Sequence, residues 1–276
     1  MHKRKHIKAL PVIDHSGFMP KHGCIPFAKK HHYFIVTGIS ITGDAPKDFI
    51  RYYQYGEGFK INPKTWPLYL AKHGHKHYPM EAITEYLLNR IGEVFGFNMA
   101  KSGLAWFGGQ IRFLSKYFLF DALIGNNDRH FYNWGIIRDV QGKKKPVFSP
   151  IYDTARGLFW NDHDDKLKEI YNDKTRLDSF IRKYSDTSSP KIGWDGYKRL
   201  NHFELAEKLT TSSFVYNCET LINSCYESKI SEVIRMIDKE FSQLLSNERR
   251  ELIKSCLLYR HSCIRKIFNF APCLKN

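Results

Sequence analysis

The sequence lacks several patterns that would place it at once in a functional class. None of its 6 cysteines forms a C-x-x-C pair or stands at zinc-ligand spacing from a histidine, so neither a disulfide framework nor a zinc finger is predicted. No apolar run approaches the roughly 20 residues that cross a bilayer. The basic start is not followed by the apolar core of a signal peptide. We therefore expect a soluble cytoplasmic protein with no membrane partner.

The charge is strongly unbalanced, because 43 Lys and Arg face 28 Asp and Glu, a net charge of +15. A positive field favours an acidic partner such as a nucleotide, a nucleic acid or an acidic protein face. No DNA- or RNA-binding motif accompanies the charge, and the basic residues are scattered rather than laid along one helix. Surplus Lys and Arg also simply keep a surface soluble. A basic nucleic-acid-binding protein therefore stays open as one alternative.

Strand-like segments occupy the first third of the chain. Residues 33–41 and 67–72 are rich in β-branched and aromatic residues and are bounded by turn formers. Residues 80–95 then place apolar side chains on one helical face and stop at Gly96. Residues 102–114 predict a hairpin around a Gly-Gly turn.

The rest of the chain is predicted to be mainly helical. Residues 116–124 form a short apolar helix that runs into a Gly-Asn-Asn-Asp cluster, and helical periodicity dominates beyond Pro190. Strands followed by helices predict an α+β protein with two lobes. The β-rich N-terminal lobe would span residues 1–115, and the helical C-terminal lobe residues 116–276.

The segment GNNDRHFYN at residues 125–133 holds an aspartate and an asparagine, Asp128 and Asn133, in a D-x-x-x-x-N spacing. Phosphoryl transfer needs a carboxylate to receive or orient the attacking hydroxyl, and oxygen ligands for Mg²⁺. Protein kinases carry their base Asp and a metal-binding Asn on one loop at this spacing. The spacing therefore indicates Asp128 as a base and Asn133 as a metal ligand.

A second carboxylate, Asp153, stands 25 residues beyond Asp128 and directly after a strand-like segment. Two short strands, at 134–138 and 146–152, fit between them and would return Asp153 to the side of Asn133. Taken singly, Asp128 is also explained as a turn former and Asp153 as a helix N-cap. The order of the residues along the chain is what favours chemistry.

Lys72 ends the second predicted strand and is the candidate contact to the ATP phosphates. Glu81 and Glu85 lie one turn apart on the next helix, so either could hold this lysine, and we favour Glu85. No G-x-G-x-x-G loop precedes Lys72. Gly56 and Gly58 are the nearest candidates for phosphate binding, although an ordinary β-turn explains this pair equally well.

Together these residues resemble a known family. Residues 123–136 (LIGNNDRHFYNWGI) and 149–153 (SPIYD) resemble the catalytic and metal-binding segments of the HipA-like serine/threonine protein kinases. Residues 69–72 (YLAK) and 81–85 resemble that family's lysine strand and following helix. The resemblance covers roughly residues 56–200.

The resemblance implies a protein-kinase-like fold that uses ATP and Mg²⁺ to phosphorylate Ser or Thr on a protein. The residues it implies are Asp128 as the base, Asn133 and Asp153 as the Mg²⁺ ligands, Lys72 with Glu85 at the phosphates, and Arg112 and His130 at the nucleotide. Several family members are toxins that act on the translation machinery. The implied partners are therefore a protein substrate, such as a component of that machinery, and an antitoxin, with nucleic acid only indirectly involved. Export as an effector is an alternative to the cytoplasm.

The middle of the chain departs from the family pattern. Only 30 residues, 98–127, separate the end of the predicted glutamate-bearing helix from Asp128. They must supply a strand pair, the hinge that grips adenine and the helix before the catalytic loop. We therefore expect a shortened segment between hinge and catalytic loop, and part of the helical core to be missing. A catalytically impaired pseudokinase that acts as a protein-binding module is the resulting alternative. Phosphatidylinositol kinases share a D-R-H-x-x-N loop, but the chain has no membrane-directed segment.

Overall fold

The computed structural model describes residues 30–37, 47–53, 57–73, 77–78, 80–99, 103–107, 110–115, 120–130, 133, 136–137, 139, 141, 143, 147–191, 197, 199–210 and 227–268. The strands are β1 Tyr33–Ile35, β2 Lys47–Tyr52, β3 Leu68–His73, β4 Gly103–Phe107, β5 Gln110–Ser115, β6 Ile136–Ile137 and β7 Val147–Phe148. The α-helices are α1 Glu81–Val94, α2 Asp121–Ile124, α3 Asp164–Tyr171, α4 Lys174–Thr187, α5 His202–Thr210, α7 Glu227–Glu240 and α8 Asn247–Ile267. Two 3₁₀ turns, Lys30–His32 and Pro63–Thr65, complete the described elements.

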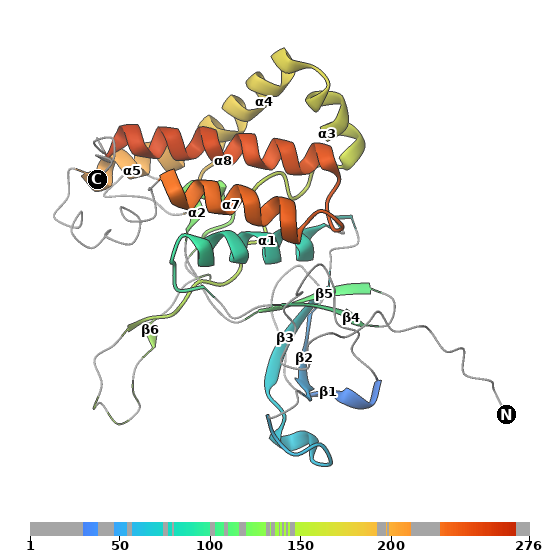
Figure 1. Cartoon of the computed structure of the whole chain (residues 1–276). Coiled ribbons are helices and arrows are strands. Elements are labelled where there is room, and N and C mark those ends of the chain that lie inside the picture. Colours follow the sequence, from blue (N-terminus) through green and yellow to red (C-terminus); the bar gives the residue numbers. More distant parts are fainter. Residues whose placement is uncertain are drawn as a thin grey trace.

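An antiparallel sheet with strand order β1-β2-β3-β5-β4 forms one side of the molecule (Figure 1). Its register places Lys47 opposite Lys72, and His73 opposite Arg112. Ile50 of β2 packs with its neighbours into a small buried cluster of its own. The sheet therefore presents Lys72 at the end of β3 that faces the helices.

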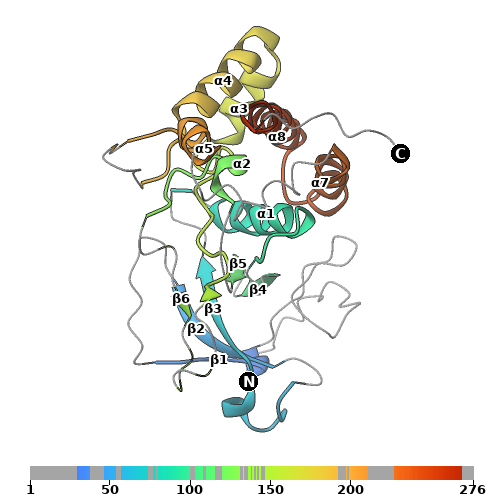
Figure 2. The same cartoon turned by 90° about the vertical axis from the view of Figure 1, so that its left-hand side faces the viewer.

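Helix α1 connects the sheet to the helical side, and Figures 1 and 2 show it between the sheet and helices α7 and α8. Its side chains Tyr86, Leu87, Leu88 and Ile91 have no exposed surface. Burial of each such side chain contributes about 1.5–3 kcal/mol. The helix ends at Val94, and Gly96 stops it as predicted, with a φ of +83° that is readily available only to glycine.

Helix α2, at the end of the predicted 116–124 helix, has only 4 residues. One buried cluster nevertheless runs from Leu123 and Ile124 of α2 to Leu252 and Leu257 of α8. Helix α8 therefore packs on the helix that leads into the predicted catalytic loop. The core is built with residues from the far end of the chain.

Arg260 of α8 binds several segments of this core and is completely buried. Its Nε and Nη2 donate to the carbonyl of Ala122 at 3.0 and 2.7 Å. Its Nη1 donates to Ser188 Oγ at 2.7 Å and to the carbonyl of Ser185 at 3.2 Å. His202 completes the network through Nδ1, 2.9 Å from the carbonyl of Ser188. These bonds fix the ends of α2 and α4 against α8.

Helix α8 confirms the helical periodicity predicted beyond Pro190. It begins after Ser246, whose side chain accepts from the Arg249 N–H. Helices α3 and α4 differ from the prediction, which placed helices at residues 80–95, at 116–124 and beyond Pro190. Their apolar stripe is sparse, with Leu167, Ile170 and Ile181 as the buried apolar residues, so periodicity gave little signal. Of the helices that the structure describes, none combines the length and apolar composition needed to cross a membrane.

His202 makes stability depend on pH. Burial and the nearby charge of Arg260 lower its pKa to about 4, from an ordinary value of 6.5. The unfolded chain therefore binds this proton first, and folded-state stability is lost as the pH falls from about 6.5 to about 4. We expect this component to reach about 3 kcal/mol. Urea unfolding across that range should show a shallower pH slope for His202→Gln; an unchanged slope would contradict the assignment.

Candidate active site

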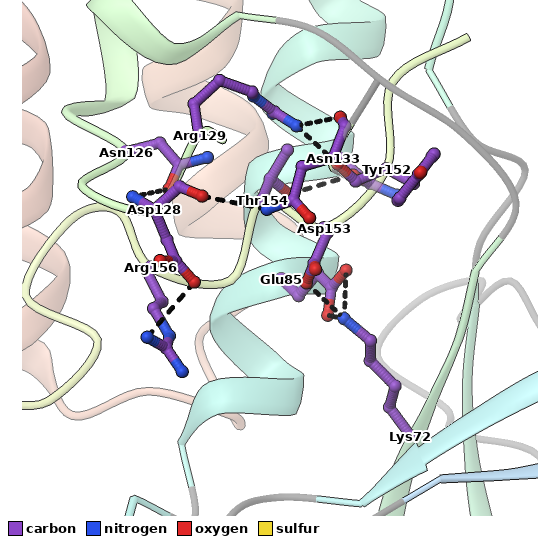
Figure 3. A network of polar contacts seen from close by, with 11 residues as sticks. Lys72, Glu85, Asn126, Asp128, Arg129, Asn133, Tyr152, Asp153, Thr154 and Arg156 are labelled. Atoms are coloured by element: carbon purple, nitrogen blue, oxygen red, sulfur yellow. Dashed lines mark hydrogen bonds and ion pairs between the residues drawn. The ribbon is translucent and has the colours of Figure 1, made fainter. Parts of the chain in front are cut away.

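Lys72 lies at the centre of an ion-pair cluster with Glu85 of α1 and the half-buried Asp153, which follows β7 (Figure 3). Its Nζ lies 3.2 and 3.0 Å from the two carboxylate oxygens of Glu85 on α1, and 2.7 Å from Asp153 Oδ1. Lys72 is 7% exposed and Glu85 1% exposed. Glu81, the alternative partner from the sequence, is one turn away. The structure therefore pairs Lys72 with Glu85, and brings Asp153 to the same ammonium group.

In this cluster one lysine directly contacts two carboxylates, while Lys47 and Arg129 act on Asp153 from farther away. Burial disfavours the charged form of Lys72, but Glu85 and Asp153 outweigh burial and raise its pKa. Burial, aided by Asp153, raises the pKa of Glu85 to about 7 despite the attraction of Lys72. Burial also disfavours ionised Asp153, yet Lys72 keeps its pKa below the ordinary value. Asp153 is therefore the carboxylate of this cluster that is held in its ionised form, the form that binds a cation.

Arg129 holds together the segments that carry the other candidate residues. Its guanidinium, 4% exposed, forms a two-pronged ion pair with Asp121 of α2, with Nη2 2.9 Å from Oδ1. Its Nη1 donates to the carbonyl of Asn133 at 2.6 Å and to that of Tyr152 at 3.0 Å. Asn133 is thereby fixed beside the residue that precedes Asp153. Arg129 had no role among the residues predicted from the sequence. The signal in the sequence was a charged residue, eight positions after Asp121, that follows an apolar helix.

The loop after α2 presents Asp128 and Asn133 together. It begins at Gly125, whose φ is +64° and whose Cβ, if present, would lie 2.8 Å from the ring of Tyr184. Asn126 Oδ1 then accepts from the Asp128 N–H at 3.0 Å. Asn133 Nδ2 donates to the Asp128 carbonyl at 2.9 Å. The loop conformation is therefore fixed at both ends of the D-x-x-x-x-N spacing.

Asp153 and Asn133 offer a donor set that suits Mg²⁺, a carboxylate and a carboxamide oxygen. Because Asn133 uses its Nδ2 on the Asp128 carbonyl, its amide orientation makes Oδ1 the atom for a metal. Asp153 has a φ of +58°, a conformation costly for most residues but tolerated by Asp and Asn. Within the described ranges no group of three His, Cys, Asp or Glu could hold a metal by itself. Phosphate oxygens and water would supply the remaining ligands.

The carboxylate of Asp128 lies between two cations. Its Oδ2 is 3.2 Å from Arg156 Nη1, as Figure 3 shows, and its Oδ1 contacts Lys191 Nζ. Neither cation was anticipated from the sequence, since each lies on a different segment from Asp128.

The structure does not bring Gly58 to Lys72. Strands β2 and β3 pair from Lys47 opposite Lys72 to Arg51 opposite Leu68, so Gly58 follows the end farthest from Lys72, beyond about 13 Å of strand. Its φ of +79° and the Thr65 carbonyl, 2.6 Å from a built Cβ, fit a turn glycine, the β-turn interpretation. The connection at the Lys72 end joins β1 to β2, and its residues 38–46 lie outside the described residues, as does Gly56.

The remaining predicted residues lie close to the cluster along the backbone. Arg112 is in β5, paired with His73, the neighbour of Lys72. The carbonyl of His130 accepts from the Asn133 N–H at 2.9 Å. Nucleotide contact by Arg112 and His130 stays a prediction. Lys47 was missed: its register partner is Lys72, and its charge contributes to lowering the pKa of Asp153.

Comparison with known proteins identifies the fold. No family model matches the chain, and no curated protein matches its sequence. Among solved structures it is similar to the Helicobacter pylori proinflammatory kinase CtkA, with a TM-score of 0.65 and 16% sequence identity over 86% of this chain and 95% of that one. The chain has a kinase-like fold. The fold prediction is confirmed at that level, whereas the lobe boundary at 115/116 stays a prediction.

The contacts of Arg129 with Asp121, Asn133 and Tyr152, called here the Arg129 clamp, can be tested by measuring the free energy of unfolding. In Arg129→Met the carboxylate of Asp121 stays buried without its cation, which typically costs about 3–5 kcal/mol. Arg129→Lys keeps the charge but loses the fork, so we expect a smaller loss. The control is Arg176→Met, whose pair with Glu169 is exposed and 4.0 Å long; this change should cost less than about 1 kcal/mol. Equal losses for Arg129→Met and Arg176→Met in urea unfolding would show that the clamp does not hold the fold together.

Proposed function

We propose that the chain transfers the γ-phosphoryl group of Mg·ATP to a Ser or Thr hydroxyl of a protein. The observation that carries the proposal is the contact of Lys72 with both Glu85 and Asp153, beside a loop that presents Asp128 and Asn133. Kinases need a lysine for the phosphates, a glutamate to hold it, a metal-binding aspartate and a loop with a base and a second ligand. The kinase-like fold supports this assignment.

Each residue has a role that its position allows. Lys72 would release Asp153 and contact the phosphates while Glu85 keeps it in place. Asn133 and Asp153 would hold Mg²⁺, which neutralises charge on the phosphates when bound. Asp128 would orient the acceptor hydroxyl and receive its proton. The acceptor oxygen bonds to the γ-phosphorus as the bond from phosphorus to the β–γ bridging oxygen breaks, and ADP leaves.

The resemblance to HipA-like kinases extends the proposal to the biological setting. In this setting the chain would be the toxin of a toxin–antitoxin pair, and its substrate would be a protein of the translation machinery. The alternative is a pseudokinase that binds protein partners, which the two cations on Asp128 and the short α2 favour. The two functions differ in phosphoryl transfer, and the next two measurements separate them.

Nucleotide binding should depend on Asp153. At about 100-fold over Kd, Mg·ATP adds about 2.7 kcal/mol of stability, or about 5–10 °C in Tm for a chain of this size. Asp153→Asn should lose most of the Mg²⁺-dependent shift, and Asn tolerates the positive φ at this position better than Ala. The control is Asp165→Asn, exposed in the first turn of α3. A full shift in Asp153→Asn would remove Asp153 from the metal site.

Transfer should depend on Asp128 in a different way. Asp128→Asn keeps the side-chain shape but cannot accept the proton, so we expect the transfer rate to fall by about 10²–10⁴-fold. The Mg·ATP-induced shift in Tm should persist, since Asp128 does not contact Lys72. Transfer can be followed with radiolabelled ATP and a mixture of protein acceptors. Undiminished transfer by Asp128→Asn would exclude it as the base, and nucleotide binding without any transfer by wild type would favour the pseudokinase.

A further inference from the structure

The segment that follows α4 lies along the loop that carries Asp128, and backbone contacts hold it there. The Ser189 N–H donates to Asn127 Oδ1 at 3.0 Å, and the Lys191 N–H donates to the carbonyl of Arg129 at 2.7 Å. The preceding end of α4 is fixed by the buried Arg260 network. The backbone of Lys191 is therefore positioned by the helical core.

Both carboxylate oxygens of Asp128 are occupied by cations from different segments. Arg156 takes Oδ2 at 3.2 Å, and Lys191 takes Oδ1. The carboxylate is only 15% exposed, so an approaching group meets these cations first. One carboxylate between two cations leaves a local charge of +1, in contrast to the Lys72 cluster, where two carboxylates share one lysine.

Arg156 is held more tightly beside Asp128 than Lys191 is. The Arg156 side chain is 28% exposed, and its guanidinium also lies over the ring of Trp160 at 5.2 Å. The Lys191 side chain is 57% exposed. Exposed ion pairs contribute only about 0–1 kcal/mol. Lys191 can therefore leave Asp128 at little cost, while Arg156 stays in place.

Transfer requires such a departure. The acceptor hydroxyl must come within about 2.6–3.2 Å of the Asp128 carboxylate. The acceptor hydroxyl can reach Asp128 Oδ1 when Lys191, the more weakly held cation, leaves that oxygen. The displaced ammonium group of Lys191 then lies beside the acceptor chain and needs a new anionic partner. An acidic side chain next to the acceptor supplies one, whereas a basic side chain repels Lys191 and favours the closed Asp128–Lys191 pair.

We propose that Lys191 selects protein acceptors that carry acidic residues next to the Ser or Thr, by exchanging Asp128 for an acidic side chain of the substrate. This inference rests on the proposed kinase function and names the substrate class of that site. The net charge of +15 is consistent with it, since a positive field draws acidic protein surfaces towards the chain. Lys191 is thus a specificity-determining residue, and the Asp128–Lys191 pair is the contact that a substrate opens.

The test uses two serine peptides of equal length, one with Asp and Glu around the serine and one with Lys at the same positions. Wild type should prefer the acidic peptide in kcat/KM by about tenfold, as one charge-assisted contact would give. Lys191→Ala should lose most of this preference through a higher KM for the acidic peptide. Lys191→Glu should reverse it. The KM for ATP should stay the same in both variants, because Lys191 acts on the acceptor side.

The matched control is Lys183→Ala, an exposed lysine of α4, which should keep the wild-type preference. Thermal unfolding with Mg·ATP accompanies each assay. If wild type gives no Mg·ATP shift, the proposed function itself fails. If wild type binds Mg·ATP but transfers phosphate to no acceptor, the transfer function fails and the pseudokinase is favoured. If wild type phosphorylates protein acceptors without preferring the acidic peptide, or if Lys191→Glu keeps the acidic preference, the role of Lys191 is overturned while the proposed function stands.

Discussion

The candidate site depends on the contacts that the buried guanidinium of Arg129 makes with three segments of the chain. The guanidinium binds Asp121 of α2, the carbonyl of Asn133 and the carbonyl of Tyr152. A buried charge that loses its partners costs several kcal/mol, so these three segments are stable only when they assemble around it. Three of the proposed chemical residues are among these contacts or next to them: Asp128 precedes Arg129, Asp153 follows Tyr152, and Asn133 is held directly.

The site divides into two halves of opposite charge balance. In one, Lys72 contacts the carboxylates of Glu85 and Asp153, and ionised Asp153 offers oxygen ligands to a cation. In the other, Arg156 and Lys191 share Asp128, so the group attracts an anion. Phosphoryl transfer needs both halves. The first has the carboxylate that would bind Mg²⁺, and the second receives the acceptor, whose charged side chains meet Arg156 and Lys191. The shared residue in each half, Lys72 or Asp128, is the one expected to change partners during the reaction.

Because helix α2 has only 4 residues, the C-terminal helices α7 and α8 supply much of the packing around the candidate site. Helix α8 packs on the four-residue α2, and Arg260 closes the network around it. Helix α7 holds α1 through the ion pair of Arg90 with Glu240 at 2.9 Å, and Phe241, the residue after α7, adds a ring contact with Tyr86. Glu85, on α1, is therefore oriented from the end of the chain.

The sequence by itself determined the local features: the helix that Gly96 stops, the hairpin strands β4 and β5, and the spacing of Asp128 and Asn133. These follow from periodicity and turn chemistry, which act over a few residues. Only the tertiary structure chose Glu85 for Lys72, joined that lysine to Asp153 across 81 positions, and placed Arg156 and Lys191 on Asp128. The reason is physical: contacts between distant segments depend on packing and on the pairing of buried charge, and neither leaves a periodic trace in the chain.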